Sequence, residues 1–306
     1  SSQPHRAMRR IAVINQKGGV GKTTTCANLG AALAQLGRRV VLIDMDAQAN
    51  LSMHLGVEVG EEELSSYSVL LGKTSLARAM RPTKTPKLFL VPSHLELSGA
   101  ELELASTFGR ETLLRIAIED WEREERSRTG SAPADYLIFD CPPSLGLLSI
   151  NALAAASEIL IALQTEFFAL QGMSTLVDVV SLLKRRLHPT LEISGILPCL
   201  YDNRKRLARE VLAEIRAYFP GKVFRTAIRA NVKLAEAPSF AQTIFEYAPE
   251  SNGALDYMRV AEEVLEGETR DAELAAKPRV AWSPIAHVDA VEQATPIVAE
   301  SARSAS

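Results

Sequence analysis

Short, mostly apolar runs alternate with longer amphipathic stretches over most of the chain. Six such runs of four or five residues cover residues 11–14, 40–43, 88–91, 136–139, 159–163 and 193–197. Runs of this length predict strands that are buried on both faces, and the helical patterns between them predict crossover helices. We therefore expect an α/β fold, a doubly wound, mostly parallel sheet with helices on both faces.

Polar residues follow three of these predicted strands at the point where each ends. Residues 15–17 come after the first strand, residues 44–46 after the second, and Asp140 after the fourth. In a doubly wound sheet, ligands bind at the carboxyl ends of the strands. The sequence therefore predicts one site that is assembled from these three segments.

A glycine-rich loop joins the first predicted strand to a helix predicted over residues 22–36. A standard P-loop, G-x-x-x-x-G-K-[ST], would place a glycine at Gln16, so the pattern fails by one residue, and a second lysine, Lys17, opens the loop. Glycines still let backbone N–H groups turn toward a phosphate, and the helix presents its positive N-terminus. Lys22 is expected to contact the β and γ phosphates, and the Thr23 hydroxyl to bind Mg²⁺. The loop residues expected to bind nucleotide are Lys17, Gly18, Gly19, Val20, Gly21, Lys22, Thr23 and Thr24.

Aspartates at the strand ends are candidates for metal binding and catalysis. Asp140 ends an apolar strand, where a Walker B carboxylate would hold Mg²⁺ directly or through water; the alternative is a helix N-cap. Asp44 and Asp46 share a face if strand geometry continues through this stretch. One of them is then expected to contact the magnesium shell while the other orients an attacking water, and the alternative is a solvated turn. The predicted metal ligands are Thr23, Asp44 and Asp140.

Charge is distributed unevenly along the chain. The formal net charge of -3 conceals a balance of +8 over residues 184–233, which leaves -11 for the remainder. Arg204, Lys205 and Arg206 open a predicted helix, which is the unfavourable end for cations in the field of the helix dipole. This asymmetry is typical of proteins that bind a polyanion, and the alternative is a solvated helix face.

The composition is that of an ordinary globular protein, 47% apolar and 23% charged. No run of 18 apolar residues is present and the 3 cysteines are scattered, so neither a membrane span nor a disulfide framework is predicted. We expect a cytoplasmic protein with a flexible leader over residues 1–8, a single domain over residues 9–268 and a flexible tail over residues 269–306. Residues 98–128 are predicted to form one or two helices.

Four motifs form a specific set: NQKGGVGKTTT at residues 15–25, DMDAQAN at 44–50, DCPPS at 140–144 and LAEAPSF at 234–240. The set resembles the ParA/MinD family of deviant Walker A ATPases, and within it the chromosomal ParA (Soj-like) partition ATPases, over about residues 9–267. The resemblance implies a P-loop NTPase of the SIMIBI type that hydrolyses ATP slowly with Mg²⁺ and forms an ATP-dependent homodimer.

The same resemblance assigns roles to individual residues. Lys17 corresponds to the signature lysine, which reaches the nucleotide of the other subunit, and Asp46 to the residue that positions the hydrolytic water. The implied catalytic residues are Lys17, Lys22 and Asp46. The adenine pocket of the family corresponds to residues 231–238, which adds Asn231 and Pro238 to the predicted nucleotide-binding residues.

The resemblance also implies a function for the basic segment. Arg204 matches the place where ParA proteins carry a DNA-contacting arginine, whereas the usual Pro-Arg-Asn reads Arg-Ala-Asn at residues 229–231, so one basic residue is displaced. The predicted DNA-binding residues are Arg204, Lys205, Arg206, Arg229 and Lys233. Too few residues precede the first strand for a helix-turn-helix, so nonspecific binding to the phosphates of double-stranded DNA is expected. A ParB-like activator protein and association with the nucleoid follow from the same likeness.

Three other classes of P-loop protein are alternatives. A MinD-like membrane-cycling ATPase would need a basic amphipathic helix where this chain is acidic after Leu265. A metabolic enzyme of the dethiobiotin-synthetase type would give no reason for Lys17 or for the basic segment. An iron–sulfur carrier would need paired cysteines, which Cys26, Cys141 and Cys199 do not provide. The sequence thus favours a partition or positioning ATPase and leaves its cargo open.

Overall fold

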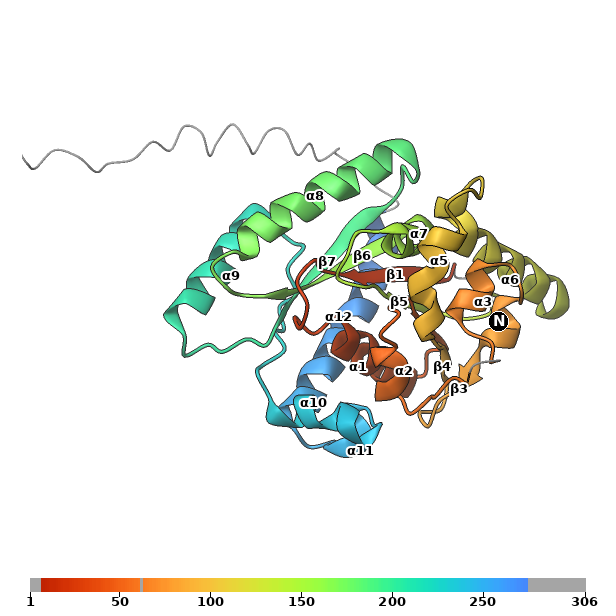
Figure 1. Ribbon diagram of the computed structural model, residues 1–306. Helices are drawn as coiled ribbons and strands as arrows, with labels where there is room; N and C mark the ends of the chain where they lie inside the picture. The colour runs from red at the N-terminus through yellow and green to blue at the C-terminus, as the bar shows by residue number, and fades with distance from the viewer. Residues whose placement is uncertain (1–6, 61–62, 275–306) are drawn as a thin grey trace, which may run out of the picture. The chain divides into compact units, whose positions relative to one another are not determined.

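A parallel sheet forms the centre of the fold (Figure 1). Within residues 7–60 and 63–274, which are those that the computed structural model describes, seven strands form one sheet in the order β3-β4-β2-β5-β1-β6-β7. The strands are β1 (Arg9–Ile14), β2 (Val40–Asp44), β3 (Arg81–Pro82), β4 (Leu88–Val91), β5 (Tyr136–Asp140), β6 (Glu158–Gln164) and β7 (Glu192–Cys199). Every pair is parallel except β3 with β4. The predicted fold class is confirmed, and each of the six predicted strands is present.

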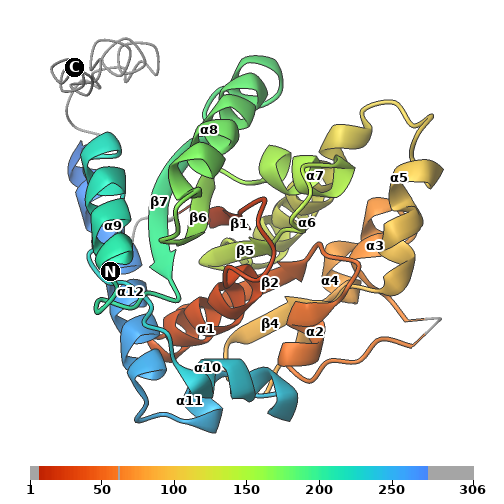
Figure 2. The same cartoon turned by 60° about the vertical axis from the view of Figure 1, so that its left-hand side comes forward.

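Helices cover both faces of this sheet (Figures 1 and 2). Helices α6, α7 and α8 lie on one face, and α1 with the first part of α12 lies on the other. The α-helices are α1 (Lys22–Gln35), α2 (Asn50–His54), α3 (Ser66–Leu70), α4 (Leu76–Ala79), α5 (Ala100–Glu103), α6 (Leu113–Thr129), α7 (Leu147–Ala155), α8 (Ala169–Arg186), α9 (Arg206–Tyr218), α10 (Val232–Glu236), α11 (Ile244–Tyr247) and α12 (Asn252–Leu274). Short 3₁₀ helices are η1 (Leu95–Gly99), η2 (Arg110–Thr112) and η3 (Ala237–Phe240).

Burial on both faces explains why the strands are continuously apolar rather than alternating. In β2, Val41 and Ile43 belong to the core cluster that also contains residues of α6, α7 and α8. Leu42 points to the opposite face, where a Cβ on Gly30 of α1 would come within 2.9 Å of its Cδ2 atom. Helix α1 therefore packs so closely on the sheet that a methyl group at this position would require Leu42 to shift, and it brings the preceding loop to the end of β1.

Two predicted boundaries differ from the structure. Met8 is buried in the core, so core packing begins one residue before the predicted domain start. Helix α12 continues to Leu274, so the boundary predicted at residue 268 falls inside a helix. By packing, the chain divides into two units, residues 1–264 and 265–306. The rest of the predicted leader, residues 1–6, and the rest of the predicted tail, residues 275–306, lie outside the described residues.

Candidate functional site

The glycine-rich loop lies at the carboxyl end of β1, directly before α1. Gly19 and Gly21 have φ values of 72° and 97°, in the left-handed region that favours glycine. Asn15 anchors the start of the loop, because its Nδ2 donates to the Ala162 carbonyl oxygen at 2.6 Å and its Oδ1 accepts from the Lys17 N–H at 3.0 Å. In the described chain no side chain caps the N-terminus of α1. Its first N–H groups are therefore arranged as an anion-binding site.

The two lysines of this loop have different surroundings. Lys22 is buried, and its Nζ donates to the Lys17 carbonyl oxygen at 3.1 Å, across the loop. Burial lowers the pKa of Lys22, and the negative charge of Asp140 opposes this shift. The Lys17 side chain is about half exposed, and its Nζ forms an ion pair with Glu166, just after β6. Lys22 is thus held within its own loop, whereas Lys17 reaches a neighbouring segment at the same edge of the sheet.

Asp140 and Thr23 form a partly buried oxygen pair at the carboxyl end of β5. Asp140 ends β5, and its Oδ2 accepts a hydrogen bond from the Thr23 hydroxyl at 2.7 Å. Its other oxygen, Oδ1, is buried and has no hydrogen-bond partner within the described chain. Burial and the nearby charge of Asp44 raise the pKa of Asp140. A buried, unpartnered carboxylate oxygen beside a hydroxyl is a donor set that suits a hard divalent cation such as Mg²⁺.

Asp44 and Asp46 do not share a face, because β2 ends at Asp44 and strand geometry does not continue. Asp44 is fully buried; its Oδ2 accepts from the N–H and hydroxyl of Ser52 at 2.9 and 2.7 Å, and its Oδ1 from the Asp46 N–H at 3.2 Å. The Oδ2 atom of Asp44 therefore holds α2 through Ser52, and Oδ1 holds the loop at Asp46; the role of Asp44 as a metal ligand stays a prediction. Asp46 instead lines the cavity, and its Oδ1 accepts from the Gln48 N–H at 3.0 Å.

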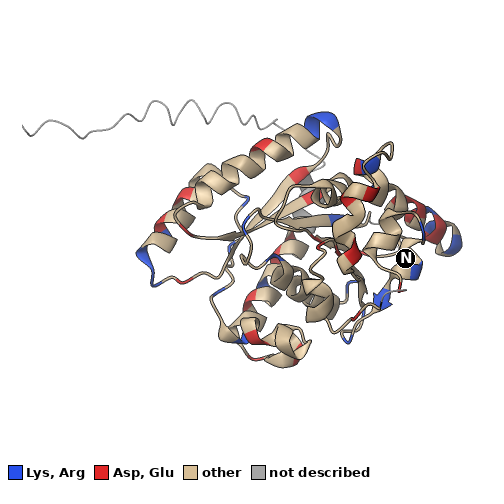
Figure 3. Ribbon diagram, viewed as in Figure 1, with Lys and Arg blue, Asp and Glu red and all other residues tan. Residues whose placement is uncertain are grey.

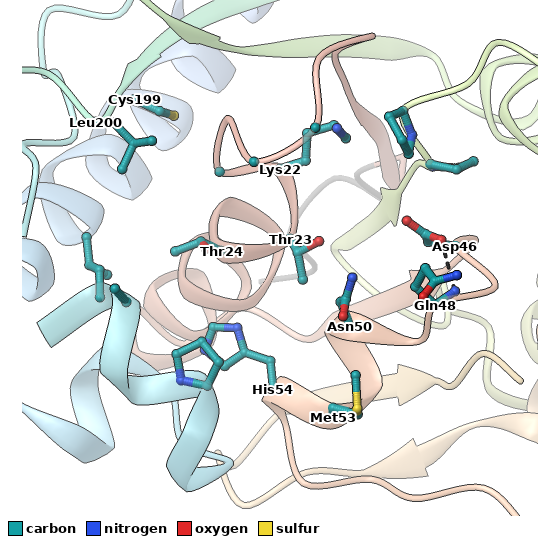
Figure 4. Close-up of a pocket in the computed structure, with 18 of the residues that line it drawn as sticks. Lys22, Thr23, Thr24, Asp46, Gln48, Asn50, Met53, His54, Cys199 and Leu200 are labelled. Carbon is teal, nitrogen blue, oxygen red and sulfur yellow. Dashed lines mark hydrogen bonds between the residues drawn. The ribbon is translucent and has the colours of Figure 1, made fainter. Parts of the chain in front are cut away.

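These residues border a cavity of about 1010 Å³ (Figure 4). In this view Asp46, Gln48 and Asn50 lie on one side of Thr23, and Thr24 and Leu200 lie on the other. Asn231 and Pro238 also line the cavity, as predicted for the base-binding side. The Asn231 side chain caps α10 by accepting from the Lys233 N–H at 2.8 Å. The structure thus brings the phosphate loop, Asp46 and the 231–238 segment around one space large enough for a nucleotide.

The predicted DNA-binding residues carry surface ion pairs of different kinds. Arg204 lies in a bidentate pair with Asp202, at 2.9 Å for both bonds, and its side chain is 87% exposed. Arg206 pairs with Glu210 at 2.6 Å on α9. Lys205 is exposed between them, at the N-cap of α9. Because exposed pairs contribute little free energy, these side chains can exchange their carboxylates for phosphates. Figure 3 also shows basic residues on the last turn of α8, which are Lys184, Arg185 and Arg186.

Arg229 differs from the rest of this set. Its guanidinium donates to both oxygens of Asp256, with a shortest distance of 2.7 Å, and its backbone N–H donates to the same carboxylate. The Asp256 side chain is only 3% exposed. The displaced arginine thus holds α12, and its assignment as a DNA contact stays a prediction. Lys233 keeps an exposed side chain and pairs with Glu236 at 3.0 Å.

Replacing Arg229 with alanine is expected to lower the free energy of unfolding by about 2 kcal/mol, because the Asp256 carboxylate would lose its charged partner in a buried position. Arg204→Ala, which opens an exposed pair, is expected to change it by less than about 1 kcal/mol. Urea unfolding of both variants measures the difference. Equal stabilities would contradict the structural role of Arg229.

A family model and the relatives found by sequence comparison identify the family of this chain. A family model described as an AAA domain matches residues 8–193. The chain is 42% identical over 254 residues to the sporulation initiation inhibitor protein Soj of Bacillus subtilis, which covers 83% of this chain and 97% of that protein. It is 44% identical over 258 residues to the chromosome-partitioning ATPase Soj of Thermus thermophilus, covering 84% of this chain and 96% of that one. The chain belongs to the ParA/MinD family of ATPases.

Solved structures of ParA/MinD-type ATPases and related proteins share the fold. A Mycobacterium smegmatis protein named cobyrinic acid a,c-diamide synthase, with a bound ATP analog and magnesium, matches with a TM-score of 0.73 at 33% identity, covering 86% of this chain and 96% of that one. MinD of Pyrococcus horikoshii, complexed with Mg-ADP, matches with a TM-score of 0.66 at 26% identity, covering 85% and 98%. Within the described residues, no helix is long and apolar enough to cross a bilayer.

Several residues of the cavity in this ParA/MinD-family chain were not singled out from its sequence. Cys199 ends β7 and Leu200 follows it, and the rule that ligands bind at carboxyl ends of strands could have found them. Tyr257, from α12, lies more than 200 residues from the glycine loop, yet its hydroxyl is 3.1 Å from the Thr25 Oγ1. His54, on α2, also lines the cavity. No local pattern marks Tyr257 or His54, because their places depend on packing between distant segments.

Proposed function

We propose that this chain is a partition ATPase that binds ATP with Mg²⁺, pairs with a second copy in the ATP-bound state and binds DNA nonspecifically in that form. Hydrolysis stimulated by a ParB-like partner then releases it, which moves or positions a chromosome, plasmid or other cargo. The observation that carries this proposal is that Lys22, Thr23 and Asp46 line one common cavity, with Asp140 bonded to Thr23. Full-length relatives named as chromosome-partitioning proteins support the cellular role.

The phosphate loop supplies binding and charge neutralisation. The N-terminus of α1 and the glycine backbone are placed for the phosphates, and Lys22, already inside the loop, adds a positive charge. Thr23 and Asp140 would hold Mg²⁺, which when bound neutralises charge on the phosphate oxygens. Asp44 already accepts hydrogen bonds from Ser52 and the Asp46 N–H, so we propose Thr23 and Asp140 as the main ligands.

Asp46 is the candidate for orienting the hydrolytic water. It is the aspartate of the 44–46 segment that faces the cavity, and the hydrogen bond from the Gln48 N–H fixes its carboxylate. Phosphoryl transfer needs chiefly positioning and electrostatic stabilisation, so a carboxylate that orders one water suffices for slow hydrolysis. The family likeness supports the same assignment.

Lys17 is proposed to act across the dimer. In this structure it pairs with Glu166, and both side chains are about half exposed, so the pair is weak and can separate. Within the proposed dimer, Lys17 would leave Glu166 for the phosphates of the partner subunit's nucleotide. For Lys17, exchanging the Glu166 carboxylate for the more highly charged phosphates is favourable. Association of the two subunits therefore depends on the bound triphosphate.

DNA binding follows from doubling the exposed basic surface. Arg204, Lys205 and Arg206 are exposed together at the start of α9. Each phosphate contact releases a counterion, so two copies joined by ATP would bind DNA much more tightly, and with steeper salt dependence, than one copy. The function is tested by DNA co-sedimentation with ATP, ADP and no nucleotide at two salt concentrations. Binding that is the same in all three nucleotide states would overturn the proposal.

Asp140→Asn is expected to weaken magnesium binding without impairing folding. The amide keeps an oxygen for the Thr23 hydroxyl but removes a buried carboxyl group whose ionised form burial disfavours. The free energy of unfolding without ligand is therefore expected to rise by about 1–3 kcal/mol. Affinity for ADP in the presence of Mg²⁺ is expected to fall, while affinity in EDTA stays close to wild type. Calorimetry in the two buffers and urea unfolding measure these effects; an unchanged response to Mg²⁺ would contradict the ligand role.

A further inference from the structure

We propose that Leu200 is an additional nucleotide-binding residue: its side chain packs against a face of the nucleotide's base, on the side of the cavity that residues of the 231–238 segment also line. The inference rests on the proposed function, since it requires that the cavity bind a nucleotide.

Leu200 exposes an apolar side chain in the cavity. Among the described residues, two large apolar side chains both line the cavity and are exposed, Met53 at 54% and Leu200 at 41%. Ligand cavities are lined largely by such side chains. Covering apolar surface that is otherwise in contact with water is favourable, so a ligand that lies against either side chain gains affinity.

The backbone of Leu200 distinguishes it from Met53. Its φ of 52° lies in the left-handed region, which costs free energy for a residue with a Cβ, whereas glycine adopts it freely and asparagine tolerates it. Met53 lies within the regular helix α2. Strained residues concentrate at ligand-binding sites, where the surrounding structure holds them. The chain has a leucine where glycine would be unstrained, which points to a function for the side chain.

Hydrogen bonds on both sides of Leu200 hold this conformation. Cys199, the last residue of β7, pairs with β6. The Tyr201 N–H donates to the Ile228 carbonyl oxygen at 2.9 Å, and the Tyr201 carbonyl oxygen accepts from the Ala230 N–H at 3.1 Å. Leu200 thus lies between two anchored residues, and a rigid backbone presents its side chain to the cavity.

The place of Leu200 in the cavity indicates which part of the nucleotide it contacts. The phosphates are expected at the N-terminus of α1. Figure 4 shows Leu200 on the opposite side of Thr23 from Asp46, the candidate for orienting the hydrolytic water. Leu234 and Pro238, of the segment proposed to bind the base, also line the cavity. The faces of a base carry no hydrogen-bonding group, so an exposed leucine on this side suits the base and not the phosphates.

The test compares Mg²⁺-ADP, which carries a base, with Mg²⁺-pyrophosphate, which does not, by calorimetry. Leu200→Gly fits the left-handed backbone and removes the side chain. We expect it to bind ADP about tenfold more weakly than the wild-type protein and pyrophosphate equally well. Leu200→Asn also fits the backbone but is polar, so it should show the same loss without the freedom of glycine. Leu200→Met keeps an apolar side chain of similar size and should bind ADP as the wild-type protein does.

A matched control separates the change of backbone from the loss of the side chain. Lys87 also has a left-handed backbone, with φ 66°, and lies outside the cavity lining. Lys87→Gly is therefore expected to bind ADP with wild-type affinity. Because glycine adopts this conformation freely, both glycine variants are expected to fold, which urea unfolding checks.

A spectroscopic readout on the wild-type protein keeps the inference testable if the variants do not fold. Protons above the face of an aromatic ring are shielded, so the Leu200 methyl signals are expected to move upfield on addition of ADP and not of pyrophosphate. Wild-type affinity for ADP in both Leu200→Gly and Leu200→Asn, an equal loss of affinity for ADP and pyrophosphate, or methyl signals that do not move would overturn the inference alone. Failure of the wild-type protein to bind ADP at all would overturn the proposed function as well.

Discussion

Replacing Asp46 with alanine is expected to reduce the rate of ATP hydrolysis by about 10²-fold or more while ATP binding persists. Asp46 lines the cavity but belongs neither to the glycine loop nor to the Thr23–Asp140 pair, so its removal affects the ordering of water and leaves the phosphate contacts intact. The ATP-bound dimer should therefore accumulate, since the step that dissolves it is blocked. Phosphate release and size-exclusion chromatography with ATP measure the two effects.

Asp46→Asn provides a matched control for shape, because it keeps the side-chain volume and an oxygen that can accept from the Gln48 N–H. It should hydrolyse ATP as slowly as the alanine variant if the negative charge orients the water. Ser52→Ala controls for indirect effects, because it removes a hydrogen bond to the buried Asp44 and so disturbs α2 without touching Asp46. Wild-type turnover in Asp46→Ala would remove this residue from the mechanism.

Replacing Arg204, Lys205 and Arg206 together with alanine is expected to weaken ATP-dependent DNA binding by about 10²-fold or more at moderate salt. These side chains are exposed and lie in weak surface pairs or beside them, so their loss should leave folding and nucleotide binding unchanged. The slope of log affinity against log salt concentration is also expected to become shallower, by about 0.9 for each phosphate contact that is lost. The single variant Arg204→Glu should abolish ATP-dependent binding while sparing nucleotide binding.

A matched control removes arginines from another part of the surface. Arg123 and Arg128 of α6 also form exposed ion pairs, and their side chains are 72% exposed. Arg123→Ala with Arg128→Ala therefore removes two positive charges, against three in the α9 variant, without altering the start of α9. Fluorescence anisotropy with a short duplex in ATP and ADP compares the two variants. An equal loss of affinity in both would mean that net charge, not the start of α9, determines DNA binding, and unchanged affinity in the α9 variant would contradict the placement of the surface.

Local patterns in the sequence were sufficient for the parts of the fold whose physics is local. A strand that is buried on both faces is continuously apolar, so residues 88–91 match β4 from end to end. The phosphate loop needs glycines at left-handed positions, and Gly19 and Gly21 take them. The two-residue edge strand β3 escaped prediction, because its pairing with β4 depends on position at the sheet edge and Pro82 argues against a strand.

The sequence by itself determined the sheet, its connecting helices and the position of the phosphate loop, because these follow from periodicity and from backbone conformations that neighbouring residues control. Only the tertiary structure decided which polar side chains are available. It turned Asp44 into the core and Asp46 toward the cavity, and it paired Arg229 with Asp256, 27 residues away. Hydrogen-bond partners and burial depend on segments that are distant along the chain, and no local pattern records which segments meet.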